Sequence, residues 1–287
     1  MSAAVSPSDI PASVAALARL ARIRVDGGLR LAFHASGRGT AAARVAEADG
    51  YRVRFPELRG HCEALILNTG GGVAGGDRVA IEIELGDAAV ATVSSVAAER
   101  VYRATGRAAR MAISLRLGAG ANLVFAPQET ILYDGADLHR TIEADVAAGA
   151  QLTFADILVL GRTGSGERVR AGRFVDRWRI RRDDRLIHAE ATRLDGAIDE
   201  HLAAAAVAGG RSVVATLLHV CEDAGDLLDR VRGAIAGGME GTIAAASAFE
   251  DRIIVRALGH RSDDVRAIIA RALVCLTKRP LPRSWAT

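Results

Sequence analysis

The residues near position 70 form the segment of this sequence that most resembles a ligand-binding motif. Gly70, Gly72 and Gly75 have the spacing G-x-G-x-x-G, directly after an apolar run. A dinucleotide site needs a helix after these glycines, because the helix N-terminus binds the pyrophosphate. Residues 78–85 instead alternate apolar and polar side chains, which predicts a β-strand. The spacing therefore does not indicate a nucleotide site, and no Lys-Ser/Thr pair follows to make it a P-loop.

Glycines between two strands allow positive φ and close approach of the backbone. The ones concerned are Gly71, Gly72, Gly75 and Gly76, and Asp77 and Arg78 follow them. Two interpretations remain open. The segment is either a tight loop, in which the aspartate and the arginine form a buried ion pair or cap the loop, or it borders a polar channel or a partner surface.

Two further motifs carry acids. Gln128 and Glu129 precede an expected strand, and Arg162 and Glu167 flank a loop of small residues. Neither motif has a nucleophile–base arrangement, and the sequence lacks both the G-x-S-x-G elbow and H-E-x-x-H. The two glutamates could serve as the carboxylate pair of a carbohydrate-active β-solenoid enzyme. Because only 4% of the residues are aromatic, a cleft that stacks sugars is poorly supported, and this enzyme remains the alternative.

Metal ligands are scattered along the chain. The seven histidines include no pair with ligand spacing, and the three cysteines are far apart without C-x-x-C. His61 and Cys62 are neighbours, but adjacent strand residues point to opposite faces. We therefore expect no tightly bound metal or cofactor. Transient passage of an ion needs only scattered carboxylates and carbonyls.

The elements that must position these motifs are mainly β-strands. Between residues 29 and 191, short period-two segments alternate with Gly and Asp turns. Residues 85–93, 117–125 and 146–154 resemble one another, each combining a strand end, a small-residue turn and a new strand. Such repetition predicts a layered, β-helix-like or solenoid body, although Ala/Gly turns also recur through composition.

A few helices are expected near the C-terminus. Residues 223–236 have helical apolar spacing, and Ser262 is expected to cap a second helix whose single apolar stripe runs from Val265 to Leu276. We expect this stripe to pack on the β body or to contribute to a partner surface. Residues 1–22 are interpreted as a mobile segment and residues 23–287 as a single domain.

Bulk properties restrict the environment and the partners. The net charge of +3 comes without a basic tract, so nucleic acid is not an expected partner. No stretch reaches the roughly 18 apolar residues that span a bilayer, and no signal peptide is expected. Three dispersed cysteines favour a reducing, cytoplasmic location.

Three motifs in order resemble the UreD (UreH) family of urease accessory proteins. They are Asn68–Arg78, Gln128–Tyr133 and Gly161–Glu167, and the ending Leu281–Trp285 is also similar to that family. The resemblance covers residues 31–285.

The resemblance implies a β-helix-like body with a few helices and no enzymatic activity. It also implies a complex with UreF, which recruits the GTPase UreG, and docking on apo-urease for nickel insertion through an internal channel. On this basis Asp77, Glu129 and Glu167 are expected along the nickel route, because hard oxygen ligands release nickel readily. The other motif residues, among them Arg78, Gln128 and Arg162, are expected to be structural.

Overall fold

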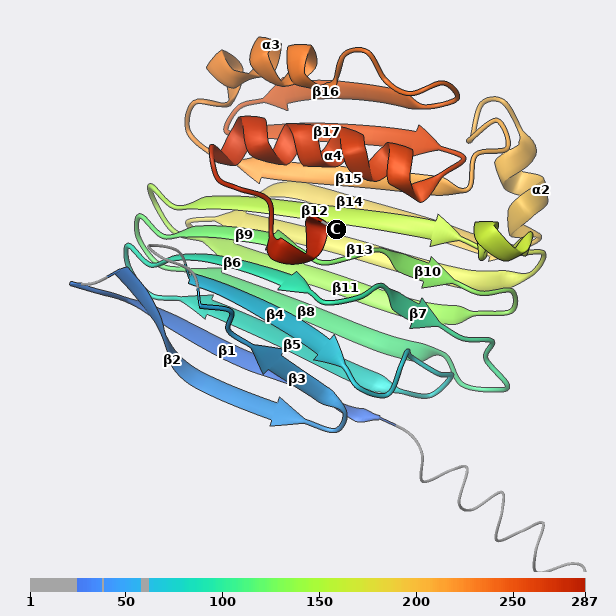
Figure 1. Cartoon of the computed structure of the whole chain (residues 1–287), viewed down its shortest axis with the longest axis horizontal. Helices are drawn as coiled ribbons and strands as arrows, with labels where there is room; N and C mark the ends of the chain where they lie inside the picture. The colour runs from blue at the N-terminus through green and yellow to red at the C-terminus, as the bar shows by residue number, and fades with distance from the viewer. Residues whose placement is uncertain (1–24, 38, 58–61, 287) are drawn as a thin grey trace, which may run out of the picture.

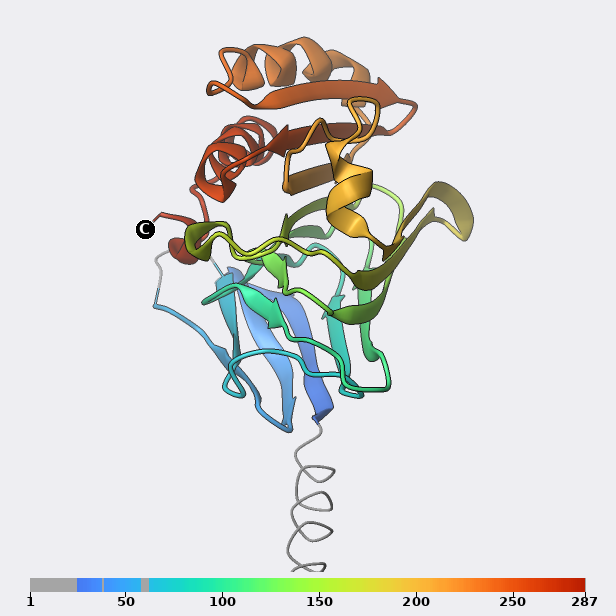
Figure 2. The ribbon, with the colours of Figure 1, turned by 90° about the vertical axis from the view of Figure 1, so that its right-hand side faces the viewer.

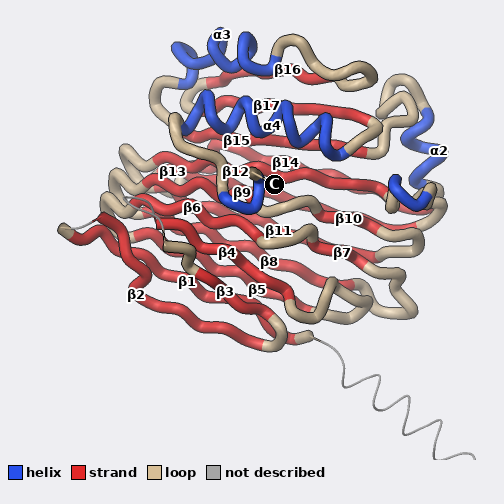
Figure 3. Tube along the Cα trace, viewed as in Figure 1, coloured by secondary structure: helices blue, strands red, loops and turns tan. Residues whose placement is uncertain are grey.

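The computed structural model describes residues 25–37, 39–57 and 62–286. It is built mainly from β-strands in two stacked sheets (Figure 1). Helices gather around the C-terminal part of the chain (Figure 3). The segment 1–22, predicted to be mobile, lies outside the described residues. The mainly β prediction is confirmed.

The first sheet has seven strands in the order β14-β13-β11-β8-β5-β1-β2. In chain order these are β1 (Asp26–Ser36), β2 (Gly39–Ala48), β5 (Arg78–Leu85), β8 (Ala109–Leu117), β11 (Asp137–Val146), β13 (Gly172–Arg182) and β14 (Arg185–Gly196). Neighbours from β1 to β13 are parallel, whereas β2 and β14 pair antiparallel at the two edges.

The second sheet has ten strands, eight of them in the order β16-β17-β15-β12-β9-β6-β4-β3, with β10 beside β12 and β7 beside β10. Their bounds are β3 (Tyr51–Arg54), β4 (Cys62–Asn68), β6 (Val90–Ser95), β7 (Glu99–Val101), β9 (Asn122–Ala126), β10 (Thr130–Leu132), β12 (Gln151–Leu160), β15 (Val213–Val220), β16 (Ile243–Phe249) and β17 (Arg252–Gly259). The pairs from β4 to β12 are parallel, and those from β12 to β16 are antiparallel.

The repeat found in the sequence is confirmed by the strand register. Corresponding residues of successive repeats stand side by side in both sheets. The aligned rows are Leu85, Leu117 and Val146 in the first sheet, and Val93, Phe125 and Phe154 in the second. The rings of Phe125 and Phe154 stack with their centroids 5.5 Å apart. The repeats are thus equivalent corners of successive solenoid coils, and their apolar side chains face the space between the two sheets.

The main core lies between the two sheets, and period-two alternation places its residues. In β5, Val79, Ile81, Ile83 and Leu85 are all buried, whereas the residues between them are exposed or half-buried. The sheet faces that point away from this core are free to carry polar residues or to pack on another layer.

A second apolar core lies where helices cover the ten-stranded sheet. The helices α3 (Ala224–Ile235) and α4 (Ser262–Thr277) bury one face each, and they lie opposite the blue N-terminal strands in Figure 2. The shorter elements are η1 (Thr163–Ser165), α2 (Ile198–Ala203) and η2 (Arg283–Trp285). The apolar stripe of α4 packs on the β body, which confirms the first of the two expected roles.

The expected cap of α4 is wrong in detail. Arg261 occupies the extended N-cap position, Ser262 is already helical, and no side chain caps the helix. Asp263 and Asp264 stand in the first turn instead, where negative charge favours the unpaired N–H groups. Across the part of the chain that the structure describes, no helix is long and apolar enough to cross a membrane.

Candidate polar sites of the solenoid

The aspartate after the glycine loop acts as a loop cap. Asp77 is 3% exposed, and its two carboxylate oxygens accept the backbone N–H groups of Val25 at 2.9 Å and Ala74 at 2.7 Å. Arg78 begins β5 with its side chain exposed, because adjacent strand residues point to opposite faces. The buried ion pair between these two residues is therefore a wrong prediction, and the capping alternative is confirmed.

The glycines let this loop lie against the next coil. A Cβ atom at Gly72 would stand 2.6 Å from the carbonyl oxygen of Arg100, and one at Gly75 would stand 2.9 Å from that of Arg107. The neighbouring Gly71 has a φ of 78°. No side chain fits such contacts, so these glycines have a structural role. The strand predicted after them is confirmed as β5.

A half-buried acid that the motifs did not indicate lies under the loop. Glu99 accepts hydrogen bonds from the Tyr51 hydroxyl at 3.0 Å and from the Asn68 amide at 2.8 Å. The same amide also donates to the carbonyl of Gly72 at 3.2 Å. Burial raises the pKa of Glu99. This cluster ties the loop to the coil beneath it.

The second motif is joined to the C-terminus. The guanidinium of Arg266 on α4 donates to the carboxylate of Glu129 at 2.9 and 3.1 Å, and also to Gln128. The amide of Gln128 donates to the carbonyl of Ser284, and the indole of Trp285 donates to the last carbonyl of β9 at 2.9 Å. Two motifs that are far apart in sequence thus form one anchor for the C-terminal segment.

The third motif is a loop held by its own ion pair. Arg162 and Glu167 are 2.9 Å apart, and the guanidinium lies 4.6 Å from the ring centroid of Tyr133. The hydrogen bond from Arg162 lowers the pKa of Glu167. Together with Asp199 and His260, this glutamate borders a surface pocket of about 340 Å³.

The three acids selected from the sequence therefore occupy separate environments. Asp77 caps a loop, Glu129 pairs with α4, and Glu167 pairs within its own loop. Because each glutamate is paired with a different arginine, the arrangement gives no support to a glycosidase pair. Among the described residues, no group of three or more His, Cys, Asp or Glu is placed to hold a metal ion.

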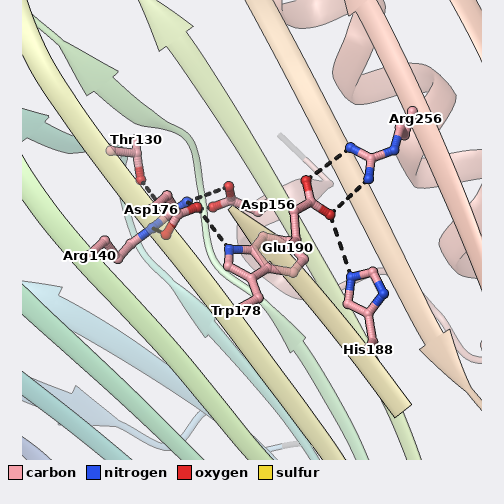
Figure 4. A network of polar contacts seen from close by, with 8 residues as sticks. All are labelled: Thr130, Arg140, Asp156, Asp176, Trp178, His188, Glu190 and Arg256. Atoms are coloured by element: carbon pink, nitrogen blue, oxygen red, sulfur yellow. Dashed lines mark hydrogen bonds and ion pairs between the residues drawn. The ribbon is translucent and has the colours of Figure 1, made fainter. Parts of the chain in front are cut away.

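A network of buried charges lies between the sheets, and no motif indicated it (Figure 4). Arg140 is 3% exposed and binds Asp156 through two contacts of 2.7 Å. It also binds Asp176 at 2.7 and 3.0 Å, and the indole of Trp178 donates to that aspartate at 2.8 Å. Burial raises the pKa of Asp156 and opposes the charge of Arg140, but the two carboxylates more than offset the latter effect and raise the pKa of Arg140.

The sequence contains a signal for this network. Arg140 lies between Leu138 and Ile142 in the inward register of β11, and two aspartates hold the same register in β12 and β13. A charged residue at an apolar position of a period-two strand is a buried charge that needs a partner.

A second acid lies next to this network. Glu190 on β14 contacts Arg256 at 2.8 Å and His188 at 3.5 Å. Burial opposes its ionisation, but its contacts with these two residues lower its pKa to about 2. Asp156, Asp176 and Glu190 all line a cavity of about 180 Å³ between the sheets.

Comparison with known proteins agrees with the motifs. Residues 25–286 match the model of the UreD urease accessory protein family. Urease accessory protein UreD 1 of Methylobacterium radiotolerans is 44% identical over 270 residues, covering 92% of this chain and 93% of that protein. Urease accessory protein UreD of Xanthobacter autotrophicus is 40% identical, covering 98% and 96%. This chain, with its two-sheet solenoid and its three motifs, belongs to the UreD family of urease accessory proteins.

Proposed function

We propose that this protein is a non-enzymatic scaffold in the cytoplasm that helps to insert nickel into apo-urease. In this proposal it binds UreF, recruits the GTPase UreG through UreF, and docks on apo-urease. The observation that carries the proposal is the family match over residues 25–286. The free state of Cys62, Cys221 and Cys275 is compatible with a reducing compartment.

Nickel is the cargo in this proposal and not a resident cofactor. Asp77, Glu129 and Glu167 remain its candidate contacts. Glu167 is the best placed of the three, because it borders an open pocket together with Asp199 and His260. These three side chains are not placed to hold a metal ion together, but single carboxylates and an imidazole suit transient contact with a divalent transition metal in transit.

The buried acids extend this route into the body of the protein. Asp156 and Asp176 share one arginine, so the trio carries one net negative charge when both carboxylates are ionised. They line the cavity between the sheets together with Glu190. An enclosed negative charge favours a cation over water in such a space.

The test is co-expression of the tagged chain with UreF, UreG and apo-urease, followed by pull-down, nickel analysis and urease assay. Glu167→Ala should slow urease activation while UreF is still retained. Glu240→Ala, which removes an exposed acid outside the pocket, is the matched control and should act as wild type. Unchanged activation by Glu167→Ala would remove this residue from the route, whereas a wild-type chain that binds neither UreF nor urease would overturn the scaffold.

A further inference from the structure

The outward face of the seven-stranded sheet carries a groove of about 650 Å³. Its floor contains the small side chains of Ala80, Ala112 and Ala191, which lie on β5, β8 and β14. The neighbouring row, two residues earlier in β5 and β8, carries the long side chains of Arg78 and Arg110. In register across the sheet, the three alanines share their row with Thr141 and Arg177, whereas Arg78, Arg110 and Arg193 share the next row with His139 and Val175. The short alanine side chains beside long arginines leave a hollow along the sheet, because outward side chains of one strand alternate every second residue.

The groove is positively charged. Its outward lining contains five arginines, namely Arg78, Arg110, Arg173, Arg177 and Arg193. Two of them, Arg173 and Arg193, share the carboxylate of Asp195 at 3.2 and 2.7 Å. The other three are exposed and form no ion pair within the described part of the chain. The acids on the lining are Asp26 and the buried Asp176, which is paired with Arg140, so the exposed arginines outnumber the acids of the lining.

The other end of the same face is balanced. There Arg30 pairs with Glu82 at 2.7 Å, and Arg181 lies 4.0 Å from Asp145. The whole chain carries only +3, so the excess of positive charge in the groove is local and does not reflect composition. Like charges on adjacent strands repel, and Arg78 and Arg110 are direct neighbours across β5 and β8. A negatively charged occupant would remove this cost.

We propose that this groove binds an extended acidic segment of a partner protein in the assembly, an inference that rests on the scaffold function. The row from Arg78 to Arg193 crosses β5, β8, β11, β13 and β14. Four strand spacings make about 19 Å, which about six extended residues span. Carboxylates on alternate residues of such a segment would meet guanidinium groups, which bind them through two parallel hydrogen bonds.

The lining favours a peptide over nucleic acid. Proteins that bind single strands place aromatic rings beneath the bases, and the described residues that line this groove include no Phe, Tyr or Trp. The alanine floor gives a peptide backbone close access to the sheet. Arg78 belongs to the glycine-rich motif, in which Asp77 has a structural role as the loop cap. The exposed side chain of Arg78 takes no part in holding that loop.

The first measurement uses the full chain and a fluorescein-labelled hexapeptide of alternating glutamate and serine, followed by fluorescence anisotropy. The variant Arg78→Gln/Arg110→Gln/Arg177→Gln should weaken binding at least tenfold. The control Arg44→Gln/Arg116→Gln/Arg181→Gln removes the same charge from the balanced end and should change the affinity less than twofold. Equal losses in both variants would overturn the groove, and so would equally tight binding of hexathymidylate.

The second measurement is pull-down of UreF and apo-urease with the same two variants. Loss of one partner in the groove variant, but not in the control, supports the docking surface. Retention of both partners by the groove variant overturns it and leaves the scaffold function intact. A wild-type chain that binds neither partner while still binding the peptide would instead overturn the proposed function. Thermal unfolding of each variant checks that these exposed substitutions leave the fold unchanged.

Discussion

The ten-stranded sheet separates two cores that solve the burial of polar groups differently. Between the sheets, the fully enclosed Arg140 is bound by two aspartates. Under the helices, Thr153 and His219 form a 2.8 Å hydrogen bond, and burial lowers the pKa of His219 to about 4, so this pair is uncharged at neutral pH. The Glu129–Arg266 pair lies at the edge of the core under the helices, and the side chain of Arg266 is 23% exposed.

This contrast bears on what each core is for. Desolvation of a buried ion pair costs about as much as the attraction between its charges returns, so apolar side chains of similar volume would stabilise the fold equally well. The core under the helices is built mainly from such apolar side chains. The charges between the sheets therefore point to a role beyond packing, either in fixing the order of the coils or in giving the interior a polar path.

The largest expected effect comes from Arg140→Met. This change leaves two buried carboxylates without their cation and should lower the free energy of unfolding by about 3–5 kcal/mol. Urea denaturation measures it. Arg177→Met, on the exposed face of the same sheet, should stay within about 0.5 kcal/mol.

Replacing the whole network sharpens this result. Arg140→Met combined with Asp156→Leu and Asp176→Leu should recover most of the lost stability, because no charge remains buried. If the triple variant were as unstable as the single one, the loss would come from packing and not from unpaired charge. If it were stable but inactive in urease activation, the network would have a functional role.

The next largest effect is expected from a cavity in the core under the helices. Leu273→Ala removes a side chain of α4 that is 2% exposed and should cost about 3 kcal/mol through lost burial and a cavity. The adjacent Val274→Ala, at 44% exposure, should change stability by less than about 0.5 kcal/mol. Equal costs for the two substitutions, measured by urea denaturation, would mean that α4 does not pack on the sheet as described.

The smallest effect concerns pH. Because the pKa of His219 falls to about 4 on folding, the unfolded state binds its proton first as the pH drops below about 6.5. The stability linked to this group is complete above that pH and is lost toward pH 4. Between pH 7.5 and 5.5, wild type should lose about 1 kcal/mol more than His219→Gln. His34→Gln, at an exposed position, should show the full wild-type loss.

Much of the architecture could be predicted because it depends on local pattern. Alternation along residues 78–85 gives the buried row of β5, and the repeated turns at residues 86–89, 118–121 and 147–150 stack in the solenoid. The cap of α4 was predicted one residue too late, at Ser262 instead of Arg261. Local preference fixes the end of a helix only to within one or two residues.

The candidate sites were harder to predict because their contacts join distant residues. The sequence identified Glu129 but not Arg266, 137 positions away, and Glu167 but not the pocket that it shares with His260. Arg140 carried a usable signal in its inward register, but the identity of its two partners depends on which strands stack beside β11.

By itself, the sequence determined the strand pattern, the coil repeat and the membership in the UreD family, because alternation, turns and motifs are properties of short segments. Only the tertiary structure decided that Asp77 caps a loop while Arg78 faces outward, and that Arg78, Arg110 and Arg177 line one groove. The reason is that electrostatic interactions depend on distance. In a solenoid, the register between successive coils sets those distances, and the packing of the whole core fixes that register.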